Sequence, residues 1–212
     1  MLTSDTLNLT DSSISEIGSD TDSEEEEHLR RHRRSSASSA QSDNLNKEEF
    51  QTEAEDSLNR AFTENHSVEN AAIELKTLRM ATNVTFHEVR EAIVAALMRI
   101  VVSAPSMVKN EFKKWGELLE TFTEDDEAQL DIALLVQKFF ARGGAAGKER
   151  VFLRGLQELY QADVLDEDVI FKWFDDERSK GVGEKWGDDM VVLRKKGEEF
   201  VNWLRTAEEE SD

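Results

Sequence analysis

From Lys47 onward the hydrophobic residues of this chain recur every three or four positions, which is the spacing of amphipathic helices. No stretch alternates apolar and polar residues convincingly enough to predict a strand. The pattern predicts helices at 47–65, 67–82, 85–100, 105–120, 123–141, 148–160, 166–178 and 188–209. Because the connections are short and the helices similar in length, we predict an all-α domain of about eight antiparallel helices stacked in layers.

Several of these helices have recognisable start signals. Ser67 precedes the second helix, and a Ser side chain at this position accepts a hydrogen bond from a free backbone N–H. Thr85 and Glu88 have the spacing of a capping box, in which each side chain bonds the other residue's backbone. The only proline, Pro105, stands where the first turn of a helix tolerates it.

The N-terminal residues have a different composition from the rest of the chain. Residues 1–46 are rich in Ser, Asp and Glu and contain no aromatic residue. Such a segment buries too little apolar area to offset the conformational entropy lost on folding. We therefore predict a disordered acidic, Ser-rich segment at 1–46 and one folded domain at 47–212.

The chain is strongly acidic, with 46 acidic and 26 basic residues and a formal net charge of -20. This charge repels nucleic-acid phosphates and anionic membranes and favours cationic partners. The absence of Cys excludes disulfides, thiolate metal sites and a cysteine nucleophile. There is no signal-peptide pattern and no apolar run of the roughly 20 residues that a membrane span needs. We expect a cytoplasmic protein that contacts neither nucleic acid nor membrane directly.

Three sequence motifs could bind a ligand or act in catalysis by residue type, but their spacing or position does not support such a role. The Gly-rich stretch 143–149 lacks the spacing, the Ser or Thr and the preceding strand of a phosphate-binding loop. His28 and His32 are four residues apart but have no third ligand nearby and lie in the predicted disordered segment. His87 has the position of a residue near a helix cap. We therefore expect no metal, no cofactor and no covalent catalysis.

Two blocks near the C-terminus combine large aromatic residues with carboxylates. The first contains Phe171, Trp173, Phe174, Asp175, Asp176 and Glu177, and the second contains Phe200, Trp203, Leu204, Glu208, Glu209 and Glu210. A helix anchored by such aromatics would present a negative rim that suits a basic partner. The same apolar spacing is typical of core residues, so the pattern is compatible with both packing and binding.

A third stretch completes a resemblance to a known family. The sequence from Asn70 to Met80, with Asn83 after it, and the two aromatic-acidic blocks resemble the C-terminal domain of the epsilon subunit of translation initiation factor 2B, in order and in spacing. The resemblance runs from about Phe50 to the last residue. It implies a HEAT-like, W2-type stack of about eight helices, in which the blocks are acidic-aromatic boxes one and two.

The resemblance also implies a function, guanine-nucleotide exchange without covalent chemistry. The implied partner is translation initiation factor 2, with GDP released from its gamma subunit and the lysine-rich tail of its beta subunit bound by the boxes. By position, Glu74 resembles the exchange glutamate, with Ile73 beside it, and Trp203 the required tryptophan of box two. The other implied partner-binding residues are Trp173, Phe174, Asp175, Asp176, Glu177, Phe200, Leu204, Glu208, Glu209 and Glu210. On its predicted helix Glu74 lies at the edge of the apolar stripe, where a side chain can reach a partner.

Two other functions stay open. An adaptor of the same fold, similar to the C-terminal domain of translation initiation factor 5, would bind lysine-rich tails without exchanging nucleotide, and a purely structural helical scaffold is the third class. The Ile73–Glu74 pair and the acidic lead-in favour the epsilon subunit.

The chain also departs from the resembled subunit in two respects. That subunit carries a nucleotidyltransferase-like domain and a left-handed β-helix ahead of this domain. We therefore expect either a fragment, which would meet the other subunits of the initiation factor 2B complex as part of a longer chain, or a separate short product. The segment 181–190, which contains Trp186, is longer than expected between the two boxes.

Overall fold

The computed structural model describes residues 45–104 and 108–209, which are helical and contain no strand. The helices are 45–63, α2 (Val68–Thr82), α3 (Phe86–Ser103), α4 (Val108–Glu120), α5 (Asp126–Arg142), α6 (Glu149–Gln161), α7 (Glu167–Asp175), the 3-10 helix η1 (Glu177–Lys180) and α8 (Gly187–Glu209). The all-α prediction is confirmed. The predicted disordered segment lies outside the described residues, except for residues 45 and 46, which begin the first helix.

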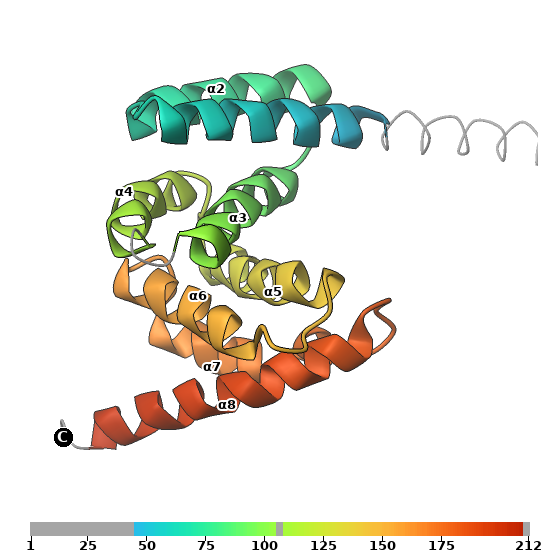
Figure 1. Ribbon diagram of the computed structural model, residues 1–212, viewed down its shortest axis with the longest axis vertical. Helices are drawn as coiled ribbons and strands as arrows, with labels where there is room; N and C mark the ends of the chain where they lie inside the picture. The colour runs from blue at the N-terminus through green and yellow to red at the C-terminus, as the bar shows by residue number, and fades with distance from the viewer. Residues whose placement is uncertain (1–44, 105–107, 210–212) are drawn as a thin grey trace, which may run out of the picture. The chain divides into compact units, whose positions relative to one another are not determined.

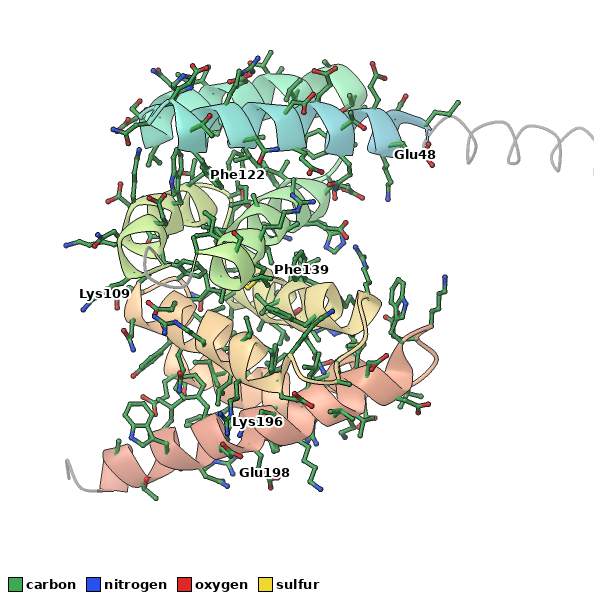
Figure 2. The ribbon with its side chains drawn as sticks, in the orientation of Figure 1. Glu48, Lys109, Phe122, Phe139, Lys196 and Glu198 are labelled. Atoms are coloured by element: carbon green, nitrogen blue, oxygen red, sulfur yellow. The ribbon has the colours of Figure 1, made fainter. Side chains whose placement is uncertain are left out.

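The helices of the described unit form successive layers, as Figure 1 shows. The helix at 45–63 lies beside α2, and α3 packs against α4 and α5. Helix α5 contacts α3, α6, α7 and α8, so it links the middle layers to the last one. Phe122, labelled in Figure 2, lies beneath the α2 layer, where the Lys76 ammonium is 5.7 Å from its ring centroid. This arrangement is the predicted HEAT-like stack.

Side-chain caps set the starts of α2, α3 and α5. The Asn70 N–H donates to Ser67 Oγ at 3.2 Å, and the Thr85 N–H donates to the Glu88 carboxylate at 2.9 Å. Helix α5 begins three residues later than predicted, because Asp125 caps it by accepting from the Ala128 N–H at 2.9 Å. Pro105, the predicted start of α4, lies outside the described residues.

The capping box of α3 also makes stability depend on pH. Glu88 is buried, which disfavours its charge, but hydrogen bonds from Lys47 and Thr85 outweigh burial and lower its pKa from 4.5 to about 2. A lowered folded-state pKa stabilises the protein above the unfolded-state pKa, and this contribution is lost as pH falls through the folded-state value. From pH 5 to pH 2, wild-type should therefore lose up to about 3 kcal/mol more stability than Glu88→Gln.

Urea unfolding followed by circular dichroism at several pH values would measure this difference. If the free energy of unfolding falls by the same amount with pH in the wild-type and Glu88→Gln proteins, the Glu88 carboxylate does not cause the pH dependence.

The core of the C-terminal layers is organised around Trp173, which has no exposed surface. Its indole N–H donates to the Gln137 side-chain oxygen at 3.0 Å. The Gln137 amide nitrogen in turn donates to the carbonyls of Ser179 and Met190, both at 2.8 Å. A Cβ at Gly197 would lie 2.6 Å from the indole, so α8 needs a glycine where it crosses the ring. One buried glutamine thus ties α5 to α7 and to the start of α8.

The segment 181–190 forms a shorter loop than the sequence predicts, because α8 already begins at Gly187. Gly181 has a φ of 70°, and a Cβ there would lie 2.6 Å from the Gly187 carbonyl oxygen. Trp186 packs under the Arg142 guanidinium, 5.3 Å from its ring centroid. The connection between the two boxes is therefore a tight turn that packs onto the end of α5.

Candidate functional site

The predicted site residues lie on two surfaces in different layers of the stack. One is on α2, in the first layer, and the other is on α7 and α8, in the last layer (Figure 1). Helices α3 to α6 lie between them in the chain and in the stack. The two predicted activities, exchange and tail binding, therefore map to separate faces of the domain.

We define the α2 surface as Arg60, Ile73, Glu74 and Met80. Ile73 is 64% exposed and Met80 is 74% exposed. Residues seven apart lie on the same face of a helix, so these two apolar side chains form an exposed stripe along α2. Such exposure of large apolar side chains is typical of a protein-binding face when polar groups border it.

Glu74 borders this stripe and pairs with the preceding helix. Its side chain is 37% exposed, and its Oε1 accepts a hydrogen bond from Nη2 of Arg60, which is 56% exposed. Arg60 lies in the last turn of the helix at 45–63. The carboxylate is thus accessible to a partner and already engaged by one cation of its own chain.

The turn between these two helices is fixed by α4. Asn65 adopts a left-handed conformation with a φ of 55°, and its side-chain oxygen accepts from the Lys114 ammonium at 2.6 Å. The Phe62 ring packs on Trp115, with centroids 4.6 Å apart. Arg60 and Glu74 therefore approach each other from two helices whose relative position is held by a third.

We define the C-terminal surface as the partly buried Tyr160, the exposed Trp203 and the exposed carboxylates Asp175 and Glu177. Trp203 is 57% exposed, and its ring stacks on Phe200 with centroids 5.9 Å apart and an interplanar angle of 15°. The Phe200 ring meets Tyr160 edge-on, with centroids 5.8 Å apart. The buried Phe200 and the partly buried Tyr160 thus support an exposed indole, which can stack on a Lys or Arg of a partner. Glu198 on α8, labelled in Figure 2, is likewise exposed.

The three acids of the first block differ in what they do. Asp176 caps η1, because its carboxylate accepts hydrogen bonds from the Arg178 backbone N–H at 2.7 Å and from the Arg178 guanidinium at 2.9 Å. The hydrogen bond with the Arg178 side chain is the main reason that the pKa of Asp176 is lowered. Glu177 pairs with Lys180 at 2.5 Å, with its side chain 78% exposed. Asp175 is exposed at the end of α7. Asp175 and Glu177 are the carboxylates that a partner can reach directly.

Several residues predicted to bind a partner instead pack in the core. Trp173, Phe200 and Leu204 are at most 3% exposed, so direct contact with a partner is closed to them. Phe174 is covered by the Arg194 guanidinium, 4.0 Å from its ring centroid. The Trp173 ring meets Gln137 of α5 and Phe152 of α6, and the Phe200 ring meets Tyr160 of α6, so both rings face the core rather than solvent. The predicted Glu210 and the side chains of Glu208 and Glu209 lie outside the described residues.

Two residues of the α2 surface, Arg60 and Met80, were not predicted as site residues from the sequence. Met80 has a local signal, because it follows Ile73 by seven residues on the same predicted helix. Arg60 has none, since its pairing with Glu74 depends on how two helices fold back on each other. Across the described ranges 45–104 and 108–209, no helix is long and apolar enough to cross a membrane, and no three His, Asp or Glu residues are grouped to hold a metal ion.

The chain is similar to known translation initiation factor subunits and to an eIF5-mimic protein. The W2 family, described as eIF4-gamma/eIF5/eIF2-epsilon, matches residues 128–212. The translation initiation factor eIF2B subunit epsilon of Schizosaccharomyces pombe is 39% identical over 211 residues, which is 97% of this chain and 30% of that protein. The subunit of the same name from Dictyostelium discoideum is 26% identical over 175 residues, 77% of this chain and 24% of that protein. The eIF5-mimic protein 2-A of Danio rerio is 33% identical over 104 residues, 47% of this chain and 22% of that protein.

The chain thus spans less than a third of the length of these relatives. The W2 match covers α5 to α8 and the C-terminal surface, whereas the similarity to the Schizosaccharomyces pombe protein also extends over nearly the whole chain, including α2.

Proposed function

Because the chain carries a C-terminal W2 domain of the eIF2B epsilon type, we propose that it is the guanine-nucleotide exchange domain that acts on translation initiation factor 2. Its part in this process is the release of GDP from the gamma subunit, in the cytoplasm. The observation that carries the proposal is the partly exposed Glu74 carboxylate on α2, bordered by the exposed apolar side chains Ile73 and Met80.

An exchange factor accelerates nucleotide release only if it binds the nucleotide-free form more tightly than the GDP-bound form. Glu74 meets this requirement by competing for a cation or a backbone N–H that otherwise holds the phosphates of GDP. Ile73 and Met80 supply the apolar contact that brings the carboxylate to the G domain. No bond forms or breaks, so no general base, nucleophile or cofactor is needed.

The C-terminal surface binds the lysine-rich tail of the beta subunit. Trp203 offers a ring face for a Lys side chain, and Asp175 and Glu177 supply the opposite charge. The net charge of -20 attracts a cationic segment from a distance and speeds its encounter. Because this surface and α2 lie in different layers of the stack, one face can hold the tail while the other acts on the G domain (Figure 1).

The decisive experiment measures GDP release from purified initiation factor 2, loaded with a fluorescent GDP analogue, with and without this chain. We expect the rate to rise with the concentration of the chain until it saturates. An unchanged release rate, combined with normal binding of a lysine-rich peptide, would contradict exchange.

That outcome would instead support an adaptor of the same fold, which binds tails without exchange. The similarity to the eIF5-mimic protein 2-A is the observation that favours this second function. An adaptor needs the C-terminal surface but has no use for an accessible carboxylate at Glu74.

Trp203→Ala should weaken the binding of a lysine-rich peptide about tenfold, because it removes an exposed aromatic ring on which a Lys side chain can stack. More than half of the ring is exposed, so the free energy of unfolding should fall by only about 1 kcal/mol. Fluorescence anisotropy of a labelled peptide at low and at high salt measures the affinity, which should fall as salt screens the charges.

Trp186→Ala is the matched control, because it removes another partly exposed tryptophan just before α8 begins. Equal peptide affinities for wild-type and Trp203→Ala would take Trp203 out of the binding surface.

A further inference from the structure

We propose that Arg60 is a positioning residue, which holds the Glu74 carboxylate in the orientation that acts on the G domain. The inference rests on the exchange function proposed above and adds a residue to which the resemblance assigns no role. Arg60 does not touch nucleotide in this scheme, and it acts through Glu74.

The geometry gives Arg60 this role. Nη2 of Arg60 donates to Oε1 of Glu74 from the neighbouring helix, and the second carboxylate oxygen has no hydrogen bond from any described residue. The Arg60 side chain therefore fixes one oxygen and leaves the other available to a partner. A glutamate side chain without this contact would sample several rotamers, and binding would have to order them.

The two backbones that carry the pair are themselves held in place. Lys114 of α4 bonds the side chain of Asn65 in the turn between the helices, and Phe62 packs on Trp115. Arg60 thus projects from a fixed helix end rather than from a loose one. Pre-organisation of this kind lowers the entropic cost of reaching the state in which GDP leaves.

The size of the effect follows from the exposure of the pair. Ion pairs between half-exposed side chains contribute about 0.2 to 1 kcal/mol. Since about 1.4 kcal/mol corresponds to a tenfold change in rate, loss of the pair should slow the maximal rate of GDP release about 1.4- to fivefold. The concentration of chain that gives half of the maximal rate should stay the same, because tail binding on the C-terminal surface brings the two proteins together.

The test compares Arg60→Ala, Arg60→Lys and Arg99→Ala as full-length chains in the GDP-release assay, each titrated to saturation. Arg60→Lys keeps a cation within reach of Glu74 and should restore most of the maximal rate. Arg99→Ala is the matched control, because Arg99 makes a comparable half-exposed pair with Glu55 of the same first helix, at 3.1 Å. It should behave as wild-type.

The inference is overturned if Arg60→Ala reaches the wild-type maximal rate or exceeds it, or if Arg99→Ala loses as much. A higher half-saturating concentration with an unchanged maximal rate would also overturn it, since Arg60 would then contribute to binding rather than to orientation. If the wild-type chain itself fails to accelerate GDP release, the exchange function fails, and this result is distinct from a failure of the positioning role.

Discussion

Glu74→Ala is expected to abolish the acceleration of GDP release while leaving the fold and the affinity for a lysine-rich peptide unchanged. The carboxylate lies on the exposed border of α2, so its removal opens no cavity and loses at most one surface ion pair, worth about 1 kcal/mol or less. Its proposed contact strengthens only as GDP leaves, and the loss of such a contact lowers the maximal rate rather than the affinity. A saturating titration in the GDP-release assay separates the two effects.

Two further variants sharpen this experiment. Glu74→Gln keeps the size of the side chain and removes its charge, so it should be as inactive as Glu74→Ala if charge is what matters. Glu69→Ala removes an exposed carboxylate from the first turn of the same helix and should exchange normally. Wild-type rates for Glu74→Ala would show that this glutamate has no part in exchange.

The fold could be predicted from the sequence because its elements carry local signals. Ser67 and the Thr85–Glu88 capping box set two helix starts within a residue of the prediction. The helix predicted at 166–178 ends earlier in the structure, because Asp176 follows the end of α7 and caps a separate 3-10 helix. This break depends on the hydrogen bonds that Arg178 donates to the Asp176 carboxylate, which helical periodicity does not reveal.

The site was less predictable, since burial is decided by contacts between distant residues. Trp173 and Trp203 occur in similar aromatic-acidic blocks, yet one has no exposed surface and the other is 57% exposed. The difference arises because Gln137 and Gly197, at positions distant in sequence, enclose the first ring. The pairing of Arg60 with Glu74 likewise follows only from the packing of two helices.

Because Trp173 is buried and Trp203 is exposed, we expect the largest loss of stability in this domain from a substitution of Trp173. Trp173→Ala should lower the free energy of unfolding by about 3 to 5 kcal/mol, because it empties a buried site between α5, α6 and α8. It also leaves the side-chain oxygen of Gln137 without its indole donor, and an unpaired buried polar group adds to the loss. Urea unfolding followed by circular dichroism measures the change.

Trp173→Phe divides this loss into its two causes. The phenyl ring keeps much of the apolar volume but has no N–H, so the deficit that it leaves, about 1 to 3 kcal/mol, reports mainly the unpaired Gln137 oxygen. Trp203→Ala, at the exposed position, is the control and should cost far less. If Trp173 acts only through packing, its variants should bind a lysine-rich peptide normally in the fraction that is folded. Weakened peptide binding by a fully folded Trp173→Phe protein would instead mean that the first block contacts the tail through a rearranged core.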